Sequence, residues 1–390
     1  MSTLSKITSA CVVLLLCMLC VPSQAQAADA KGERVADALK KAKSLYAPDG
    51  RTAVWDLEWD ESSQSIKGKV SHESLLAQLK DEMGRSGLGS LKYSVKVLES
   101  SVPAEKRWAI VKLSVASLRC DGKHSAEMAT QAVMGTPVKV LELVGEWCRV
   151  QTPDNYISYA PESSLQFVTD AQFDAWRTSR RYIVTVYGTR LLAAAQADET
   201  VSDLVLGNVL QWRGENDKWV QLATPDGRVG YVEKSQVAPL DVWAQQAYDD
   251  ALLERTCRRM LGSGYLWGGT STKVTDCSGL MKIAYLANGI ILSRDASQQA
   301  LTGEKIADWH KAELGDLLFF GNSKTGRVTH VGMYLRDGLY IHCSGQVKIN
   351  SLEEKSPLYL YSPLSISRIK TRIGTTGIIP VRDHSWFFAR

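Results

Sequence analysis

The fold of this chain is decided by the stretch Thr275-Asp276-Cys277-Ser278-Gly279-Leu280. The residues that follow, 278–288, carry apolar side chains at helical spacing, which places Cys277 at the N-terminus of a predicted helix. A thiol attacks only as a thiolate, and the helix dipole with its free N–H groups stabilises an anion at that end. We therefore predict that Cys277 is a nucleophile and that its helix lowers the pKa of the thiol. The alternative for any single cysteine is a buried, unreactive side chain.

Two histidines follow on a predicted hairpin of two strands, residues 327–335 and 339–344. If the turn has three residues, His342 lies diagonally across from His330 on the same face, within reach of its ring. A two-residue turn would separate them. His330 can then accept the thiol proton, and His342 can orient the His330 ring as the third member of a triad does. Cys343 is expected to point away from that face. The paired Cys and His spacings of a zinc site are missing, so no metal or cofactor is expected.

Five motifs in the last third of the chain carry a family resemblance. They are Tyr265-Leu266-Trp267-Gly268-Gly269, Asp276-Cys277-Ser278-Gly279-Leu280, Gly315-Asp316-Leu317-Leu318-Phe319-Phe320, Thr329-His330-Val331-Gly332-Met333-Tyr334-Leu335 and Ile341-His342. Through them residues 245–390 resemble an NlpC-type cell-wall peptidase, which has a papain-like fold. The resemblance implies cysteine-peptidase chemistry by Cys277, His330 and His342, with the Cys277 backbone N–H and the Tyr265 side chain holding the oxyanion. Core packing is the alternative role for Tyr265 and Trp267.

An internal repeat with an offset of 72 residues precedes this region. Gly135, Trp147, Thr152-Pro153-Asp154 and Tyr159 recur as Gly207, Trp219, Thr224-Pro225-Asp226 and Tyr231. Both copies read as short strands between turns and resemble bacterial SH3-like domains, over 108–168 and 180–240. Such domains bind wall peptide or pack on the enzyme, and the sequence leaves both roles open. Residues 30–106 predict a further small α+β domain of unknown role. Alternation at residues 55–59 predicts a strand, apolar spacing at 75–83 an amphipathic helix, and residues 93–98 another strand.

The SH3-like pair, the Tyr265-x-Trp267 motif and the run Arg294-Asp295-Ala296-Ser297 resemble the YkfC-like branch of the family. The resemblance implies cleavage between γ-D-glutamate and the following diamino acid, diaminopimelate or lysine, in peptides with a free N-terminal L-alanine. It places the peptide between the peptidase domain and the first SH3-like domain, where Glu127 pairs with the ammonium group and Asp295 adds a second acceptor. A solvated surface charge is the alternative role for Glu127. Tyr156 is expected to line the same pocket; Tyr159 competes with it for that role, although its place in the repeat makes Tyr159 the likelier core residue. The implied substrate-binding residues are Glu127, Tyr156, Tyr265, Trp267, Asp276, Ser278, Asp295 and Ser297.

The first residues predict a secretory signal peptide. The apolar run 10–21 is too short to span a membrane, and Ala25-Gln26-Ala27 has the small residues of a cleavage site. We expect cleavage after Ala27 and an exported protein, periplasmic or secreted. A lipid anchor is not expected, because leucine stands directly before both Cys17 and Cys20.

Charge and composition limit the kinds of partner that the protein is expected to bind. The 390-residue chain has a formal net charge of +4 and no basic run, which argues against nucleic acid. No segment after residue 27 is apolar enough to cross a bilayer, and a monomer is expected. Five cysteines remain after signal cleavage; Cys120 and Cys148 form a disulfide or stay as two buried thiols.

The sequence thus predicts an α+β protein in which a papain-like NlpC-type domain follows two small all-β SH3-like barrels and an N-terminal α+β domain. The expected divisions are 1–27, 30–106, 108–168, 180–240 and 245–390. Three functions compete: a γ-D-glutamyl–diamino acid endopeptidase acting on released peptides, an amidase or endopeptidase acting on intact peptidoglycan, and a wall-binding protein without activity. The last is disfavoured because all three catalytic residue types are present.

Overall fold

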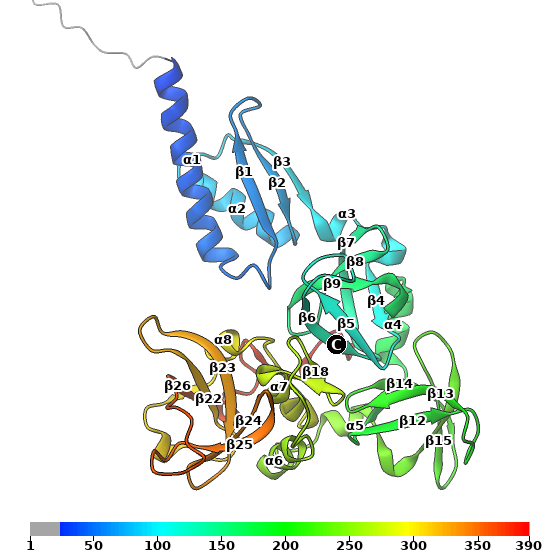
Figure 1. Ribbon diagram of the computed structural model, residues 1–390. Coiled ribbons are helices and arrows are strands. Elements are labelled where there is room, and N and C mark those ends of the chain that lie inside the picture. Colours follow the sequence, from blue (N-terminus) through cyan, green and yellow to red (C-terminus); the bar gives the residue numbers. More distant parts are fainter. Residues whose placement is uncertain (1–23, 390) are drawn as a thin grey trace, which may run out of the picture.

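The computed structural model describes residues 24–389, and Figure 1 shows four units along the chain. An N-terminal α+β unit is followed by two barrel-like β units and by a larger α+β unit that carries Cys277. The C-terminal tail returns to the first barrel, where the Trp386 ring packs edge-on against Trp108 with centroids 5.1 Å apart. The apolar run of the expected signal peptide lies outside the described residues.

The N-terminal unit is a three-stranded sheet with two helices. β1 (Trp55–Asp60) pairs antiparallel with β2 (Ser65–Val70), and α2 (Glu73–Arg85) then returns the chain so that β3 (Lys92–Val97) runs parallel to β2. α1 (Gln24–Tyr46) packs against both α2 and β1. The sequence predicted β1, α2 and β3, but it did not predict α1 or β2.

Each copy of the repeat forms a seven-stranded antiparallel sheet around its own hydrophobic core. Trp147 and Trp219, the repeated tryptophans, are both buried. The first barrel comprises β4 (Trp108–Val111), β5 (Val115–Arg119), β6 (Met128–Val133), β7 (Pro137–Val144), β8 (Trp147–Gln151), β9 (Ile157–Pro161) and β10 (Leu165–Val168). The second comprises β11 (Arg181–Val184), β12 (Gly188–Leu192), β13 (Thr200–Val205), β14 (Val209–Glu215), β15 (Trp219–Ala223), β16 (Val229–Glu233) and β17 (Val237–Pro239). Helix α4 (Asp170–Thr178) connects them.

The last unit packs a buried helix on a six-stranded sheet. The helix is α7 (Cys277–Ala287), and the sheet has the order β21-β26-β22-β23-β24-β25. Its strands are β21 (Glu304–Ile306), β22 (Leu317–Asn322), β23 (Arg327–Tyr334), β24 (Leu339–Ser344), β25 (Gln346–Ser351) and β26 (Ser365–Arg368). Shorter elements surround them: α5 (Leu240–Ala244), α6 (Asp250–Arg258), β18 (Thr270–Ser271), β19 (Val274–Thr275), β20 (Ile290–Leu292), α8 (Ala296–Gln299) and β27 (Ile378–Pro380).

The histidine hairpin has the register on which the predicted triad depends. Gly332 pairs with His342, and the Leu335 N–H donates to the Leu339 carbonyl, which leaves a three-residue turn at 336–338. His342 is therefore the diagonal neighbour of His330. The turn closes with positive φ at both Asp337 and Gly338.

The described cysteines Cys120, Cys148, Cys257, Cys277 and Cys343 are all free thiols, so the open alternative of a Cys120–Cys148 disulfide is not realised. Cys120 is exposed on the first barrel, whereas Cys148 lies in its core. Within residues 24–389, no helix is both long and apolar enough to cross a membrane.

Candidate active site

Cys277 is the first residue of α7, and Asp276 caps that helix. The Asp276 Oδ1 accepts the Gly279 N–H at 2.7 Å, and its Oδ2 accepts the Gly268 N–H at 2.9 Å. A Cβ on Gly279 would lie 1.9 Å from the Gly269 carbonyl oxygen, so only glycine allows this approach of the loop to the helix. The motif residues on both sides of Cys277 therefore fix the position of its thiol.

The two histidines and Asn350 form a hydrogen-bonded series. The Asn350 amide nitrogen donates to the Leu358 carbonyl at 2.7 Å, which leaves its Oδ1 2.8 Å from His342 Nε2. Because an amide oxygen only accepts, His342 carries its proton on Nε2 and accepts at Nδ1. His330 Nε2 lies 2.7 Å from that Nδ1 and donates to it. A neutral His330 then has Nδ1 free to accept the thiol proton.

Burial keeps the reacting groups neutral in the free protein. It raises the pKa of the Cys277 thiol to about 11, and the neighbouring Asp276 carboxylate adds to the shift. Burial also lowers the pKa of His330, with His342 and Lys348 contributing. The predicted lowering of the Cys277 pKa is therefore wrong for the free protein, because the helix N-terminus does not offset the loss of solvent. Proton transfer to His330 belongs to the reaction with bound substrate.

The Cys277 sulfur also lies close to β23, the strand that carries His330. It accepts from the backbone N–H of Val331, the residue directly after His330. Cys343, on β24, is fully buried and directs its sulfur at the Thr275 carbonyl, as expected from its position on the opposite face. Of these two thiols, only Cys277 faces a cleft.

A cleft of about 870 Å³ opens at Cys277, and three units of the chain line it. It brings together the whole set of predicted substrate-binding residues, Glu127, Tyr156, Tyr265, Trp267, Asp276, Ser278, Asp295 and Ser297. Trp267 is 59% exposed, which favours a surface for ligand over core packing. Burial and the nearby Cys277 raise the pKa of Tyr265, so its phenol remains a hydrogen-bond donor.

Tyr156, and not Tyr159, lines the cleft. Its hydroxyl donates to Asp295 Oδ2 at 3.2 Å. Tyr159 is only partly buried and stacks under the Arg149 guanidinium, so the prediction that it is the likelier core residue is wrong. Glu127 is exposed at the cleft, with its carboxylate available to a ligand.

Sequence reasoning missed two arginines. Arg294 is 1% exposed and binds Asp276 Oδ2 at 2.5 Å and Ser278 Oγ at 3.0 Å, so it holds the residues on both sides of the nucleophile. Arg51, from the N-terminal unit, lies 2.8 Å from Asp295 Oδ2. Arg294 stood within a quoted motif without an assigned role, whereas no local pattern marks Arg51.

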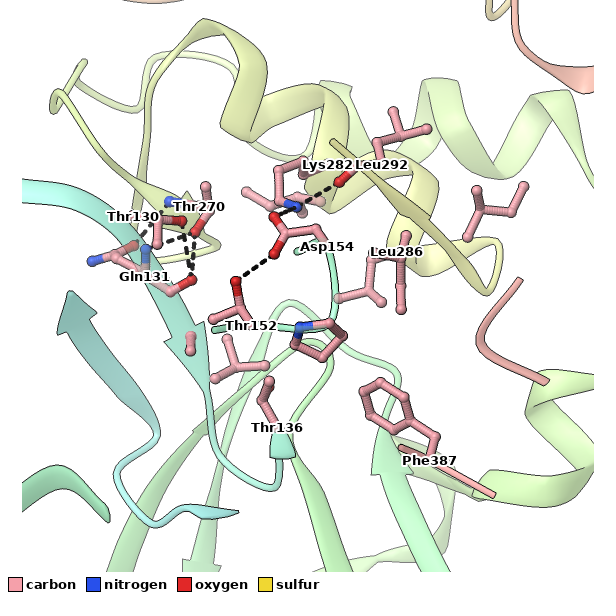
Figure 2. Close-up of a pocket in the computed structure, with 16 residues that line it drawn as sticks. Thr130, Gln131, Thr136, Thr152, Asp154, Thr270, Lys282, Leu286, Leu292 and Phe387 are labelled. Atoms are coloured by element: carbon pink, nitrogen blue, oxygen red, sulfur yellow. Dashed lines mark hydrogen bonds and ion pairs between the residues drawn. The ribbon is translucent and has the colours of Figure 1, made fainter. Parts of the chain in front are cut away.

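One ion pair and several hydrogen bonds join the first barrel to α7 and β18 (Figure 2). We call these contacts, made by Asp154 and Lys282 and by Gln131 and Thr270, the polar seam. Lys282 Nζ lies 2.6 Å from Asp154 Oδ2 and donates to the Leu292 carbonyl at 2.7 Å. Nearby, Gln131 on β6 exchanges hydrogen bonds with Thr270 on β18. Since Lys282 follows Cys277 on the same helix, the seam holds the first barrel in place beside the nucleophile.

Comparison with known proteins agrees with this architecture. Residues 262–361 match the NlpC/P60 family, and residues 118–165 match the bacterial dipeptidyl-peptidase Sh3 domain. A solved NlpC/P60 family structure from Bacillus cereus has a TM-score of 0.58 at 22% identity and covers 67% of this chain and 99% of its own. The predicted papain-like fold with SH3-like domains is thereby confirmed.

Curated relatives cover most of their own length in the match. Dipeptidyl-peptidase 6 of Lysinibacillus sphaericus is 31% identical over 265 residues, which are 64% of this chain and 94% of the relative. Gamma-D-glutamyl-L-lysine dipeptidyl-peptidase of Bacillus cereus is 30% identical over 233 residues, which are 56% of this chain and 68% of the relative. With its predicted nucleophile at the cleft and its histidine series behind it, the chain belongs to the NlpC/P60 family of cysteine peptidases.

Proposed function

We propose that the protein hydrolyses the bond between γ-D-glutamate and the following diamino acid in peptidoglycan-derived peptides that begin with free L-alanine. The observation that carries the proposal is the shared cleft, in which Glu127 and Tyr156 of the first barrel face the same space as Cys277. A carboxylate beside a phenol suits an ammonium group, because both offer oxygen acceptors. The activity named for the Bacillus cereus relative supports the same bond.

The geometry suits acyl transfer to sulfur. Cys277 passes its proton to His330 Nδ1 as the sulfur attacks the γ-carbonyl carbon of D-glutamate. The Cys277 backbone N–H and the Tyr265 hydroxyl hold the oxyanion. His330 then protonates the leaving amine of the diamino acid, and a water molecule, deprotonated by His330, hydrolyses the thioester. His342 and Asn350 keep His330 Nε2 as the donor throughout.

The alternative, hydrolysis of intact peptidoglycan with the SH3-like domains as wall-binding modules, has less support. The first barrel forms one wall of the cleft and supplies four of its lining residues, Cys120, Glu127, Ala129 and Tyr156. That position suits a barrel that shapes the substrate site of its own enzyme.

We also propose that the protein is exported. The mature protein begins at or near Ala28, acts as a monomer and meets its peptides outside the cytoplasm. Intact-mass spectrometry of the native protein is expected to give the mass of a chain cut after Ala27. An intact leader, or a lipid on Cys17 or Cys20, would contradict this.

Glu127→Gln is expected to lower kcat/KM on L-Ala-γ-D-Glu-L-Lys about 10- to 100-fold, the size of one charge-assisted hydrogen bond. N-acetylation of the peptide should cost the wild type a similar factor. The acetyl group should cost the variant little more, because both changes remove the same contact. Steady-state hydrolysis rates on the two peptides measure all four values.

Glu146→Gln serves as the matched control, since Glu146 is an exposed carboxylate of the same barrel outside the cleft lining. Its kcat/KM should stay within about twofold of the wild type on both peptides. If N-acetylation costs Glu127→Gln as large a factor as it costs the wild type, Glu127 does not bind the ammonium group. The alternative function on intact peptidoglycan would then be favoured.

A further inference from the structure

The N-terminal unit reaches the cleft through one turn, residues 47–54, between α1 and β1. The Arg51 carbonyl accepts the N–H of Ile157 on the first barrel at 2.7 Å. Its guanidinium binds Asp295 Oδ2 at 2.8 Å and Ser297 Oγ at 3.0 Å on the peptidase unit. The N-terminal unit, the first barrel and the peptidase unit therefore meet at this residue.

Arg51 is held in one position. Its Nε and one terminal nitrogen bind the two Asp49 oxygens at 2.8 Å each, in addition to the bonds to Asp295 and Ser297. Four of its five N–H donors are thus engaged. Asp49 is fixed in turn by Gln298 Nε2 at 2.8 Å. This side chain is a built part of the cleft wall.

The contact with Asp295 places Arg51 beside the residues assigned to the peptide's amino terminus. Asp295 Oδ2 accepts hydrogen bonds from both Arg51 and the Tyr156 hydroxyl. Its expected role as a second ammonium acceptor, together with Glu127, stays a prediction. Asp49 and Asp295 pair with the Arg51 guanidinium, so the exposed Glu127 carboxylate in the same cleft lining is the group that attracts a cation.

We propose that Arg51 is a specificity-determining residue that closes the amino-terminal end of the cleft, so that a peptide with a free ammonium group fits and an acylated or extended one does not. The proposal rests on the proposed function, which puts the ammonium group beside Glu127. An acyl group brings bulk where the guanidinium stands and removes the positive charge that Glu127 attracts. The N-terminal unit would thereby help to restrict the enzyme to released peptides.

The test compares kcat/KM on N-acetylated and free L-Ala-γ-D-Glu-L-Lys for each variant of the full chain. Arg51→Ala should raise the ratio of acetylated to free peptide at least about tenfold over the wild type. Arg51→Lys retains a cation and most of the bulk, so its ratio should stay within about threefold. If a variant is partly unfolded, kcat/KM falls by the same factor on both peptides, so the ratio of acetylated to free peptide still reports specificity.

Lys96→Ala is the matched control, because Lys96 also joins the N-terminal unit to the first barrel, 3.9 Å from Glu142, but lies outside the cleft lining. It should leave the ratio unchanged. An unchanged ratio in Arg51→Ala would overturn the proposal, even if both rates rose together, as they would if Arg51 only obstructed the cleft. A wild type that cleaves neither peptide would instead refute the proposed function, and this inference with it.

Discussion

Cys277→Ala and His330→Ala are each expected to abolish hydrolysis of the free peptide. In a serine-peptidase triad, loss of the nucleophile or of the base costs on the order of 10⁶ in kcat, and loss of the third member about 10⁴. His342→Ala should therefore leave a measurable residual rate, and Asn350→Ala a higher one. Asn350 acts only through His342, by fixing which of its ring nitrogens carries the proton. Single-turnover assays at high enzyme concentration resolve these low rates.

Cys343→Ala provides the matched control for the nucleophile. Its thiol is fully buried near the same site and donates to the Thr275 carbonyl at 3.5 Å. The variant should lose some stability, because a small cavity replaces the sulfur, and should keep hydrolysis within about tenfold of the wild type. Full activity in Cys277→Ala would end the cysteine-peptidase mechanism for this site. Equal residual rates in His342→Ala and His330→Ala would show that His342 does more than orient the base.

The sequence was most informative where the relevant contacts are local. Alternation in residues 327–344 and the length of their turn set the register that brings His330 and His342 together. The cap made by Asp276 is equally local, because its bond from the Gly279 N–H spans only three residues. Asn350 was missed because it reaches His342 through the pairing of a third strand. No periodicity of its own marks it as part of the site.

Contacts between units account for the other failures. Arg51 and Asp295 are 244 residues apart, and the arginine stands in a short turn whose composition suggests only a loop. The pKa of Cys277 was predicted with the wrong sign because the helix N-terminus can be read locally, whereas burial of the thiol depends on the sheet and loops that cover it. Burial of this kind is a property of the assembled fold.

Comparing the two copies of the repeat shows how much the ion pair between Asp154 and Lys282 contributes to stability, because the second copy has the equivalent aspartate without a contact to α7. In both copies the threonine hydroxyl donates to the aspartate two residues later, Thr152 to Asp154 and Thr224 to Asp226. The surroundings then differ. Asp154 pairs with Lys282, and the two side chains are 6% and 16% exposed. Asp226 pairs with Arg228 at side-chain exposures of 24% and 40%.

Asp154→Ala is expected to destabilise the protein by about 3–5 kcal/mol, because it takes the carboxylate from the mostly buried Lys282 ammonium and leaves it the Leu292 carbonyl. Asp226→Ala breaks the same local threonine bond and a solvated ion pair, which contributes about 1 kcal/mol or less. Urea denaturation followed by tryptophan fluorescence compares the midpoints of the two variants with the wild type at pH 7.

The pH dependence of this difference gives a second readout. Burial alone would raise the pKa of Asp154, but the charge and hydrogen bond of Lys282 outweigh it and lower the pKa in the folded protein. The stabilisation is therefore complete above the unfolded value of about 3.9 and is lost as the pH falls through the lower folded value. The gap between wild type and Asp154→Ala should narrow in acid. Equal losses in Asp154→Ala and Asp226→Ala at pH 7 would mean that Lys282 finds another partner and that the seam does not depend on this pair.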